Sequence, residues 1–196
     1  MTVLPEAQLV GAFQLSAPDC EGMRYRSWLV ARQEDALHAL ADFRGRRAVA
    51  NSVDSHSGYN ALRYVITPLS ARGRFFSALR LSGSHRRSLA CLCAGETDLA
   101  AIDCLTWALL WRHAASELQG LAIIGETPLY PASPLITSAQ TDAQMLATLR
   151  RVVAQVAEEK AARDSFISGF AVPERTDYQE ILRWEEDAAA LGVTAL

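Results

Sequence analysis

The stretch of the chain best suited to chemistry is a polar segment at residues 51–60. It carries Ser55, Ser57 and Gly58 between a strand-like run and a run with helical spacing. Small hydroxyl residues and glycine at the start of a helix leave backbone N–H groups at the positive end of the helix dipole, where an oxyanion binds readily. The segment therefore predicts an anion-binding loop, with a serine that only caps the helix as the alternative interpretation.

Two further polar positions also follow strand-like runs. Ser84 and His85 come after residues 78–81, and Asp103 comes directly after residues 99–102. Because the carboxyl ends of parallel strands meet at one edge of a sheet, we expect these residues to face the same crevice as the serine-rich segment. Helix starts and a histidine suit an anion, whereas Asp103 suits a cationic or hydroxyl group of the same ligand. The combination predicts a small zwitterionic or protonated oxyanion.

The elements that must hold these residues alternate between two hydrophobic periods from about Phe43 to Gly125. Strand-like runs occur at residues 46–50, 78–81, 99–102 and 121–124, and helices are expected at residues 58–69, 84–94 and 104–115. Strands alternating with helices are typical of an α/β fold with a mostly parallel sheet.

The flanking regions predict the rest of a two-lobed chain. Two strand-like runs, at residues 7–13 and 27–32, precede the α/β region, and a proline-rich crossover at residues 127–134 follows it. Thr141 to Gln144 has the form of a capping box that opens a long helix. We expect residues 1–42 to form part of a first lobe and a crossover strand, residues 43–126 to form a second lobe with the anion site, and residues 127–196 to form a return crossover and C-terminal helices packed on the first lobe.

Composition excludes several classes of protein. The chain has 196 residues with a formal net charge of -3 and 21% charged residues. Its basic residues are scattered, so a nucleic-acid surface is not expected. No apolar run reaches the roughly 18 residues that a membrane span needs. The first residues show no basic start followed by an apolar stretch, so the sequence does not predict a secretory leader.

The cysteines and histidines do not predict a metal or redox centre. The four cysteines, Cys20, Cys91, Cys93 and Cys104, lack a C-x-x-C pair, so we expect buried, reduced thiols and no disulfide framework. A metal site built from His56, His85, Asp103 and Cys104 is a weak alternative, since no pair has ligand spacing on one helix face. We expect neither a metal nor a cofactor.

Four sequence pieces together resemble a known family. They are Asp42-Phe-Arg-Gly45-Arg, Ser55-His-Ser57-Gly58-Tyr59, Gly83-Ser84-His85 and the run from Ala94 to Asp103. From Leu40 to Thr137 the chain resembles the phosphonate-binding family of periplasmic solute-binding proteins, the substrate-capture components of phosphate, phosphite and phosphonate ABC transporters. The resemblance implies a type II periplasmic-binding-protein fold with two lobes.

The resemblance also implies roles for individual residues. Ser55, Ser57 and Gly58 would hold the phosphonate oxygens together with the Ser84–His85 helix start, where His85 is a further oxygen ligand. Asp103 would contact the amino or hydroxyl end of the ligand. Tyr25 looks like the family's aromatic residue on the crossover strand.

The family implies an ABC permease as partner and a periplasmic location. Members begin with a strand–helix–strand segment that would precede Ala7, so we expect an incomplete first lobe here. The missing leader leaves a cytoplasmic location open. A truncated or cytoplasmic homologue without a transport role is the first alternative, and two copies could pair to cover the half-built lobe.

An enzyme is the second alternative. Ser57, His85 and Asp103 could act as nucleophile, base and orienting group. The serine segment lacks a G-x-S-x-G turn, because Ser55 and Tyr59 stand at the glycine positions. Two equivalent serines suit an anion cradle better than one activated nucleophile, so we expect a binding protein rather than an enzyme.

Overall fold

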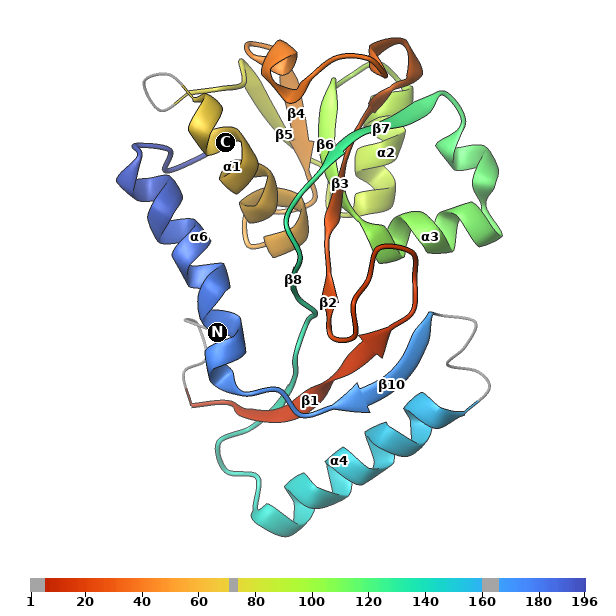
Figure 1. Ribbon diagram of the computed structural model, residues 1–196, viewed down its shortest axis with the longest axis vertical. Coiled ribbons are helices and arrows are strands. Elements are labelled where there is room, and N and C mark those ends of the chain that lie inside the picture. The colour runs from red at the N-terminus through yellow and green to blue at the C-terminus, as the bar shows by residue number, and fades with distance from the viewer. Residues whose placement is uncertain (1–5, 71–73, 160–165) are drawn as a thin grey trace. The chain divides into compact units, whose positions relative to one another are not determined.

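The computed structural model describes residues 6–70, 74–159 and 166–196. The chain divides into two compact units (Figure 1). The smaller unit contains Met1–Tyr25 and Leu129–Gln179, and the larger unit contains Arg26–Pro128 and Glu180–Leu196. No helix within the described ranges is long and apolar enough to cross a membrane.

A five-stranded sheet forms the centre of the larger unit. Its strand order is β5 (Ala78–Leu81), β4 (Arg47–Ala50), β6 (Leu99–Asp103), β3 (Ser27–Arg32) and β7 (Leu121–Glu126). β4 is parallel to β5 and β6, whereas β3 is antiparallel to both β6 and β7. The expectation of a mostly parallel sheet is confirmed, with β3 as the exception. β3 runs the other way because it starts at the edge where β6 ends, with Ser27 opposite Asp103.

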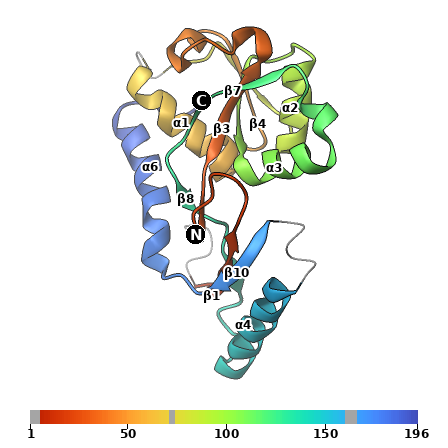
Figure 2. The same ribbon diagram turned by 45° about the vertical axis from the view of Figure 1, so that its right-hand side comes forward.

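Helices cover both faces of this sheet. A π-helical turn, His56–Asn60, leads into α1 (Ala61–Ile66) and a 3-10 turn, Thr67–Leu69, on one face. α2 (His85–Cys93) packs on the other face, and α3 (Cys104–His113) follows β6. Figures 1 and 2 show α1 and α2 on opposite sides of the sheet.

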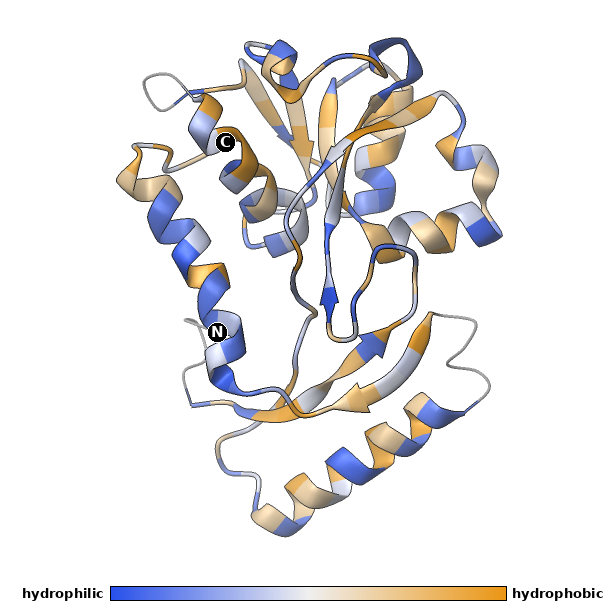
Figure 3. Cartoon of the chain, in the orientation of Figure 1, coloured by the Kyte–Doolittle hydropathy of each residue, from blue (hydrophilic) through white to orange (hydrophobic). Residues whose placement is uncertain are grey.

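The alternation of side chains along the strands explains the two layers. Successive residues of a strand point to opposite faces. Leu29 therefore packs with Leu62 of α1, while Val30 packs with Leu89 of α2. The apolar residues of the strands and helix faces appear as orange ribbon in Figure 3.

An ion-pair network closes the sheet edge at which β4 begins. The Asp98 carboxylate accepts hydrogen bonds from the backbone N–H and guanidinium of Arg47 and from Arg32 at 3.1 Å. The Arg47 guanidinium holds the pKa of Asp98 well below its usual range. Asp98 thereby ties the start of β4 to the end of β3.

The smaller unit has a three-stranded antiparallel sheet in the order β10 (Ile167–Ala171), β1 (Gln8–Leu15) and β9 (Leu135–Thr137). A short ladder pairs β2 (Arg24–Tyr25) with β8 (Tyr130–Pro131). The long helix α4 (Ala143–Glu158) packs on this sheet, and Arg150 donates hydrogen bonds to backbone carbonyls of β1 (Figure 2). Among its described residues, this unit therefore consists of the three-stranded sheet, the short ladder and one long helix.

The cap of α4 differs from the expected one. Asp142, not Thr141, caps the helix by accepting a hydrogen bond from the Met145 N–H at 2.8 Å. The Thr141 hydroxyl instead meets the Thr137 hydroxyl at 2.8 Å. The expected helix is present, and it begins one residue later than the capping-box pattern indicated.

The division between units also differs from the expected boundaries of residues 1–42, 43–126 and 127–196. Residues 26–42 lie in the larger unit, because β3 pairs with β6 and β7. The last helix, α6 (Gln179–Ala190), contributes Trp184 to the larger unit, where its ring stacks on Tyr64 at 4.2 Å between centroids. Sequence spacing alone gives no information on which sheet a strand or helix joins.

Candidate functional site

The ends of β4, β5 and β6 bring three polar segments to one edge of the larger sheet. Past the end of β4, the carbonyl of Asn51 accepts a hydrogen bond from the Gly83 N–H at 2.8 Å. Asp103, the last residue of β6, then caps α3 by accepting from the Thr106 N–H at 2.7 Å. The serine-rich segment, the Ser84–His85 segment and Asp103 therefore lie together at this edge.

Three of the predicted site residues meet directly. The Ser57 hydroxyl lies 2.8 Å from His85 Nε2, and the same nitrogen lies 3.2 Å from Asp103 Oδ2. The side chains of His85 and Asp103 are only 11% and 13% exposed. We call this group the Ser57–His85–Asp103 cluster.

Neighbouring strands and helices fix the cluster in place. The hydroxyl of Thr106 donates to Asp103 Oδ2 at 2.6 Å, and the hydroxyl of Ser27 on β3 donates to the carbonyl of Ser57 at 2.9 Å. These two hydrogen bonds fix the Asp103 carboxylate and the backbone of Ser57 before any ligand is present.

Ser55 and Ser84 lie close by and cap helices. Ser55 Oγ accepts from the Gly58 N–H at 3.0 Å, and Ser84 Oγ accepts from the Arg87 N–H at 3.2 Å. The Gly58 N–H is therefore already bonded within the loop. Both serine oxygens therefore act as helix caps, as the alternative interpretation predicted. Because an oxygen that accepts a hydrogen bond can still donate its own hydrogen, both O–H groups stay available to a ligand. Their contact with a ligand stays a prediction.

Gly58 is required by close packing. A Cβ at this position would lie 1.9 Å from Asn51 Oδ1 and 3.1 Å from His85 Cε1. The Asn51 side chain consequently lies inside the site, although the residue pattern did not single it out. Its Oδ1 is buried and has no hydrogen-bond partner among the residues that the structure describes. The sequence offered one indication of this role, which is that Asn51 is the first residue after β4.

Tyr25 lies in the smaller unit. It pairs with Tyr130 in the β2–β8 ladder, and the two rings pack edge to face with centroids 4.6 Å apart. Its role toward a ligand stays a prediction.

Burial sets the charge of the histidines near the site. Burial lowers the pKa of His85, while the Asp103 carboxylate and the backbone carbonyl of Ala101 act in the opposite direction. Burial also lowers the pKa of His56 to about 4. Both rings are therefore neutral at pH 7.

The cluster does not have the geometry of a serine hydrolase relay. In such a relay the carboxylate bonds one ring nitrogen and the serine bonds the other. Here Ser57 and Asp103 both approach Nε2 of His85. The carboxylate therefore cannot orient the ring from the far side while Nε2 activates the hydroxyl.

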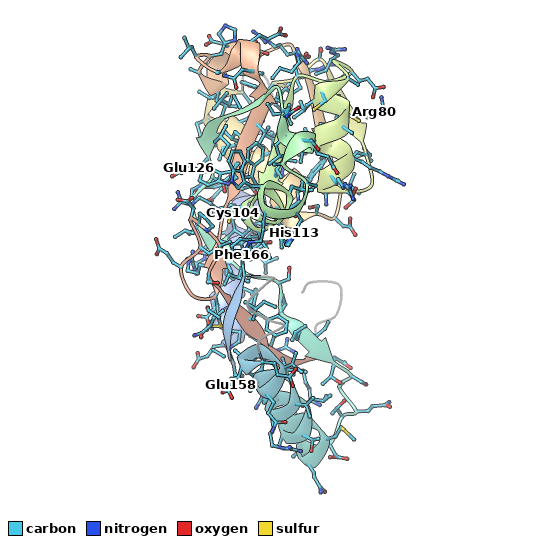
Figure 4. All side chains as sticks on the ribbon, turned by 90° about the vertical axis from the view of Figure 1, so that its right-hand side faces the viewer. Arg80, Cys104, His113, Glu126, Glu158 and Phe166 are labelled. Carbon is cyan, nitrogen blue, oxygen red and sulfur yellow. The ribbon has the colours of Figure 1, made fainter. Side chains whose placement is uncertain are left out.

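The metal-ligating residue types do not converge. Within the described part of the chain, no three His, Cys, Asp or Glu side chains are grouped so that they could hold a metal ion. All four cysteines are reduced thiols. Cys91 and Cys104 are buried as expected, whereas Cys20 is half-buried and Cys93 is exposed. Figure 4 shows Cys104 and His113, the first and last residues of α3.

Solved structures share this fold. The methylphosphonate complex of PhnD1 from Prochlorococcus marinus matches with a TM-score of 0.80 and 16% identity over 94% of this chain and 72% of that chain. A binding-protein component of an ABC phosphonate transporter from Pseudomonas aeruginosa matches with a TM-score of 0.73 and 18% identity, over 93% and 63% of the chains. The adipate complex of Rpa4515 from R. palustris matches with a TM-score of 0.62 and 14% identity, over 93% and 69%.

No curated protein sequence matches this chain. A family match does exist, and it covers residues 8–178, which include the whole Ser57–His85–Asp103 cluster. The two-lobed α/β fold agrees with that match. The chain belongs to the family of periplasmic substrate-binding proteins of phosphonate ABC transporters.

Proposed function

We propose that this protein is the substrate-binding component of an ABC uptake system and captures a phosphonate, phosphate or related small oxyanion. The observation that carries the proposal is the Ser57–His85–Asp103 cluster, which lies at the carboxyl ends of the parallel strands. Ligands of α/β sheets bind outside this edge. In this role the protein delivers its ligand to a permease in the periplasm and performs no chemistry on it.

Each site residue has a role in the proposed complex. Hydroxyl groups of Ser55, Ser57 and Ser84 donate to ligand oxygens, and His85 is a further oxygen ligand. Gly58 lets the loop approach closely. Asp103 accepts a hydrogen bond from the amino or hydroxyl end of the ligand, and Tyr25 contributes from the crossover strand.

A thermal-shift titration tests the proposed function. Phosphate, phosphite, methylphosphonate, 2-aminoethylphosphonate and sulfate are compared, with adipate added because one structural neighbour carries it. A ligand that binds only the folded state stabilises it by about 2.7 kcal/mol at a hundredfold excess over Kd. We expect a saturable shift with a phosphorus oxyanion and none with sulfate. A shift with adipate alone would replace the proposal with carboxylate capture.

A further inference from the structure

His85 Nε2 is shared by two oxygen atoms that make opposite demands. The Ser57 hydroxyl lies 2.8 Å from it and can donate to a bare nitrogen. The Asp103 carboxylate lies 3.2 Å from it and can only accept, so it requires a hydrogen on the nitrogen. A neutral ring with a bare Nε2 satisfies Ser57 and leaves Asp103 facing a lone pair. A ring with Nε2–H satisfies Asp103 and leaves the Ser57 hydrogen free to turn elsewhere.

The cluster has no cationic side chain bonded to it within the described residues. On α2 itself, Arg86 forms an ion pair with Glu117, and Arg87 is exposed, with its Nη1 3.4 Å from the position of a Cβ on Gly83. At the start of β3, Arg26 forms an ion pair with Glu126 of β7.

The other titratable groups on the elements around α2 do not supply a positive charge to the cluster either. Burial keeps His56 neutral, and Asp54, in the loop before it, is exposed and acidic. On the neighbouring strands, Arg32 and Arg47 both bond Asp98 where β4 begins. Arg80 of β5 is paired with Glu96. With His85 neutral, the cluster carries the single negative charge of Asp103, and a dianion would meet repulsion.

We propose that His85 takes up one proton from solvent when the oxyanion binds, so that the site forms its own cation and accepts a dianion. This inference rests on the oxyanion-binding function proposed above. The added proton completes the imidazolium, and Nε2–H then donates to Asp103 Oδ2. His85 therefore acts on the ligand oxygens through its positive charge rather than through a direct hydrogen bond. Ser57 no longer donates to the ring, and its hydroxyl hydrogen turns to a ligand oxygen. One proton on His85 thus balances the negative charge of Asp103 and frees the Ser57 hydroxyl to donate to the ligand.

Calorimetric titration with methylphosphonate tests the proton uptake. Binding is measured near pH 7.5 in two buffers that differ in ionisation enthalpy, for the native chain, for His85→Gln and for the control His113→Gln. His113 is an exposed histidine at the far end of α3. Glutamine retains a hydrogen-bonding group but cannot take up a proton. Any proton that methylphosphonate itself takes up on binding is counted in all three proteins, so the difference between them reports on His85. We expect the native chain and His113→Gln to take up about one proton more than His85→Gln.

The native protein supplies an independent measurement. Nitrogen-15 spectra of labelled histidine distinguish a neutral ring from an imidazolium, with and without methylphosphonate. We expect His85 to change from neutral to doubly protonated, and the native affinity to rise by up to about tenfold per pH unit as pH falls. Binding with His85 still neutral would overturn this inference and leave the proposed function standing. No binding of any phosphorus oxyanion would overturn the proposed function and this inference with it.

Discussion

Gly58 and Asn51 show how single residues shape the site. The Asn51 side chain fills the space that a Cβ on Gly58 would need, and His85 lies against the same point. A ligand loop can be this tight only with a glycine at its turn into the helix. The loop conformation and the His85 ring position therefore depend on each other.

The first prediction concerns Gly58→Ala. The new methyl group would force the Asn51 side chain and His85 to move, so we expect methylphosphonate affinity to fall at least about tenfold, the equivalent of 1.4 kcal/mol. Gly125→Ala is the matched control, because its Cβ would meet Leu29 Cδ1 at an ordinary 3.4 Å. Calorimetric titration measures both. Equal affinity of Gly58→Ala and the native chain would contradict the described packing.

The second prediction concerns Ser57→Ala. Removal of the hydroxyl leaves a ligand oxygen without a charge-assisted hydrogen bond, which costs roughly 1–3 kcal/mol of binding free energy. Ser116→Ala, at an exposed serine, should bind like the native chain. Calorimetric titration with methylphosphonate measures both affinities. A loss of less than twofold for Ser57→Ala would remove this hydroxyl from the site.

The sequence predicted the cluster because each member ends a strand or starts the next helix. Such positions are recognisable from local spacing, and the parallel strands then bring them together. Asn51 escaped prediction because its importance depends on contact with Gly58, seven residues away along the chain. Spacing also could not indicate that Ser57 and Asp103 share one nitrogen of His85.

At the scale of elements, α6 packs against the turn that carries Ser57. The Trp184 ring packs on Tyr64 of α1 and lies 5.3 Å, between centroids, from the ring of His56. Because His56 lies between Ser55 and Ser57, α6 contacts the serine-rich segment through this ring. The sequence predicted C-terminal helices packed on the first lobe, whereas α6 belongs to the larger unit. Its apolar partners lie too far away in sequence to be identified from periodicity.

The third prediction concerns the pH dependence of stability. Burial lowers the pKa of His56 from 6.5 to about 4, so the unfolded chain binds more protons than the folded chain between these values. Stability should therefore fall as pH drops from 6.5 toward 4, by roughly 3 kcal/mol at most. Urea unfolding at several pH values measures it. His56→Gln should show a shallower dependence, and an equal slope in both proteins would contradict the burial of the ring.

At the scale of the whole molecule, the Asp98 ion-pair network and the proposed binding cluster lie at opposite edges of one sheet. Asp98 joins Arg47 and Arg32 at the edge where β4 begins, and the cluster lies where β4 ends. The two groups are separated by the length of the parallel strands. They should respond to mutation independently.

The fourth prediction concerns Asp98→Asn. Loss of the carboxylate leaves two arginines without their shared partner, so we expect the free energy of unfolding to fall by about 2–4 kcal/mol. Methylphosphonate affinity should stay unchanged below the melting temperature. Calorimetric unfolding and a binding titration measure the two effects. A comparable loss of affinity would mean that the sheet edges are coupled.

The packing of the tail has a consequence for the protein as it is synthesised. The five strands of the larger sheet are all made once the ribosome passes Glu126, yet the apolar cluster that contains Leu29 and Leu62 also includes Val193. Trp184, which covers Tyr64, likewise emerges late. The nascent chain therefore exposes an apolar face on α1 throughout the synthesis of the smaller unit's last helix and strand. The core of the larger unit is therefore completed only after the last residues of the chain have been made.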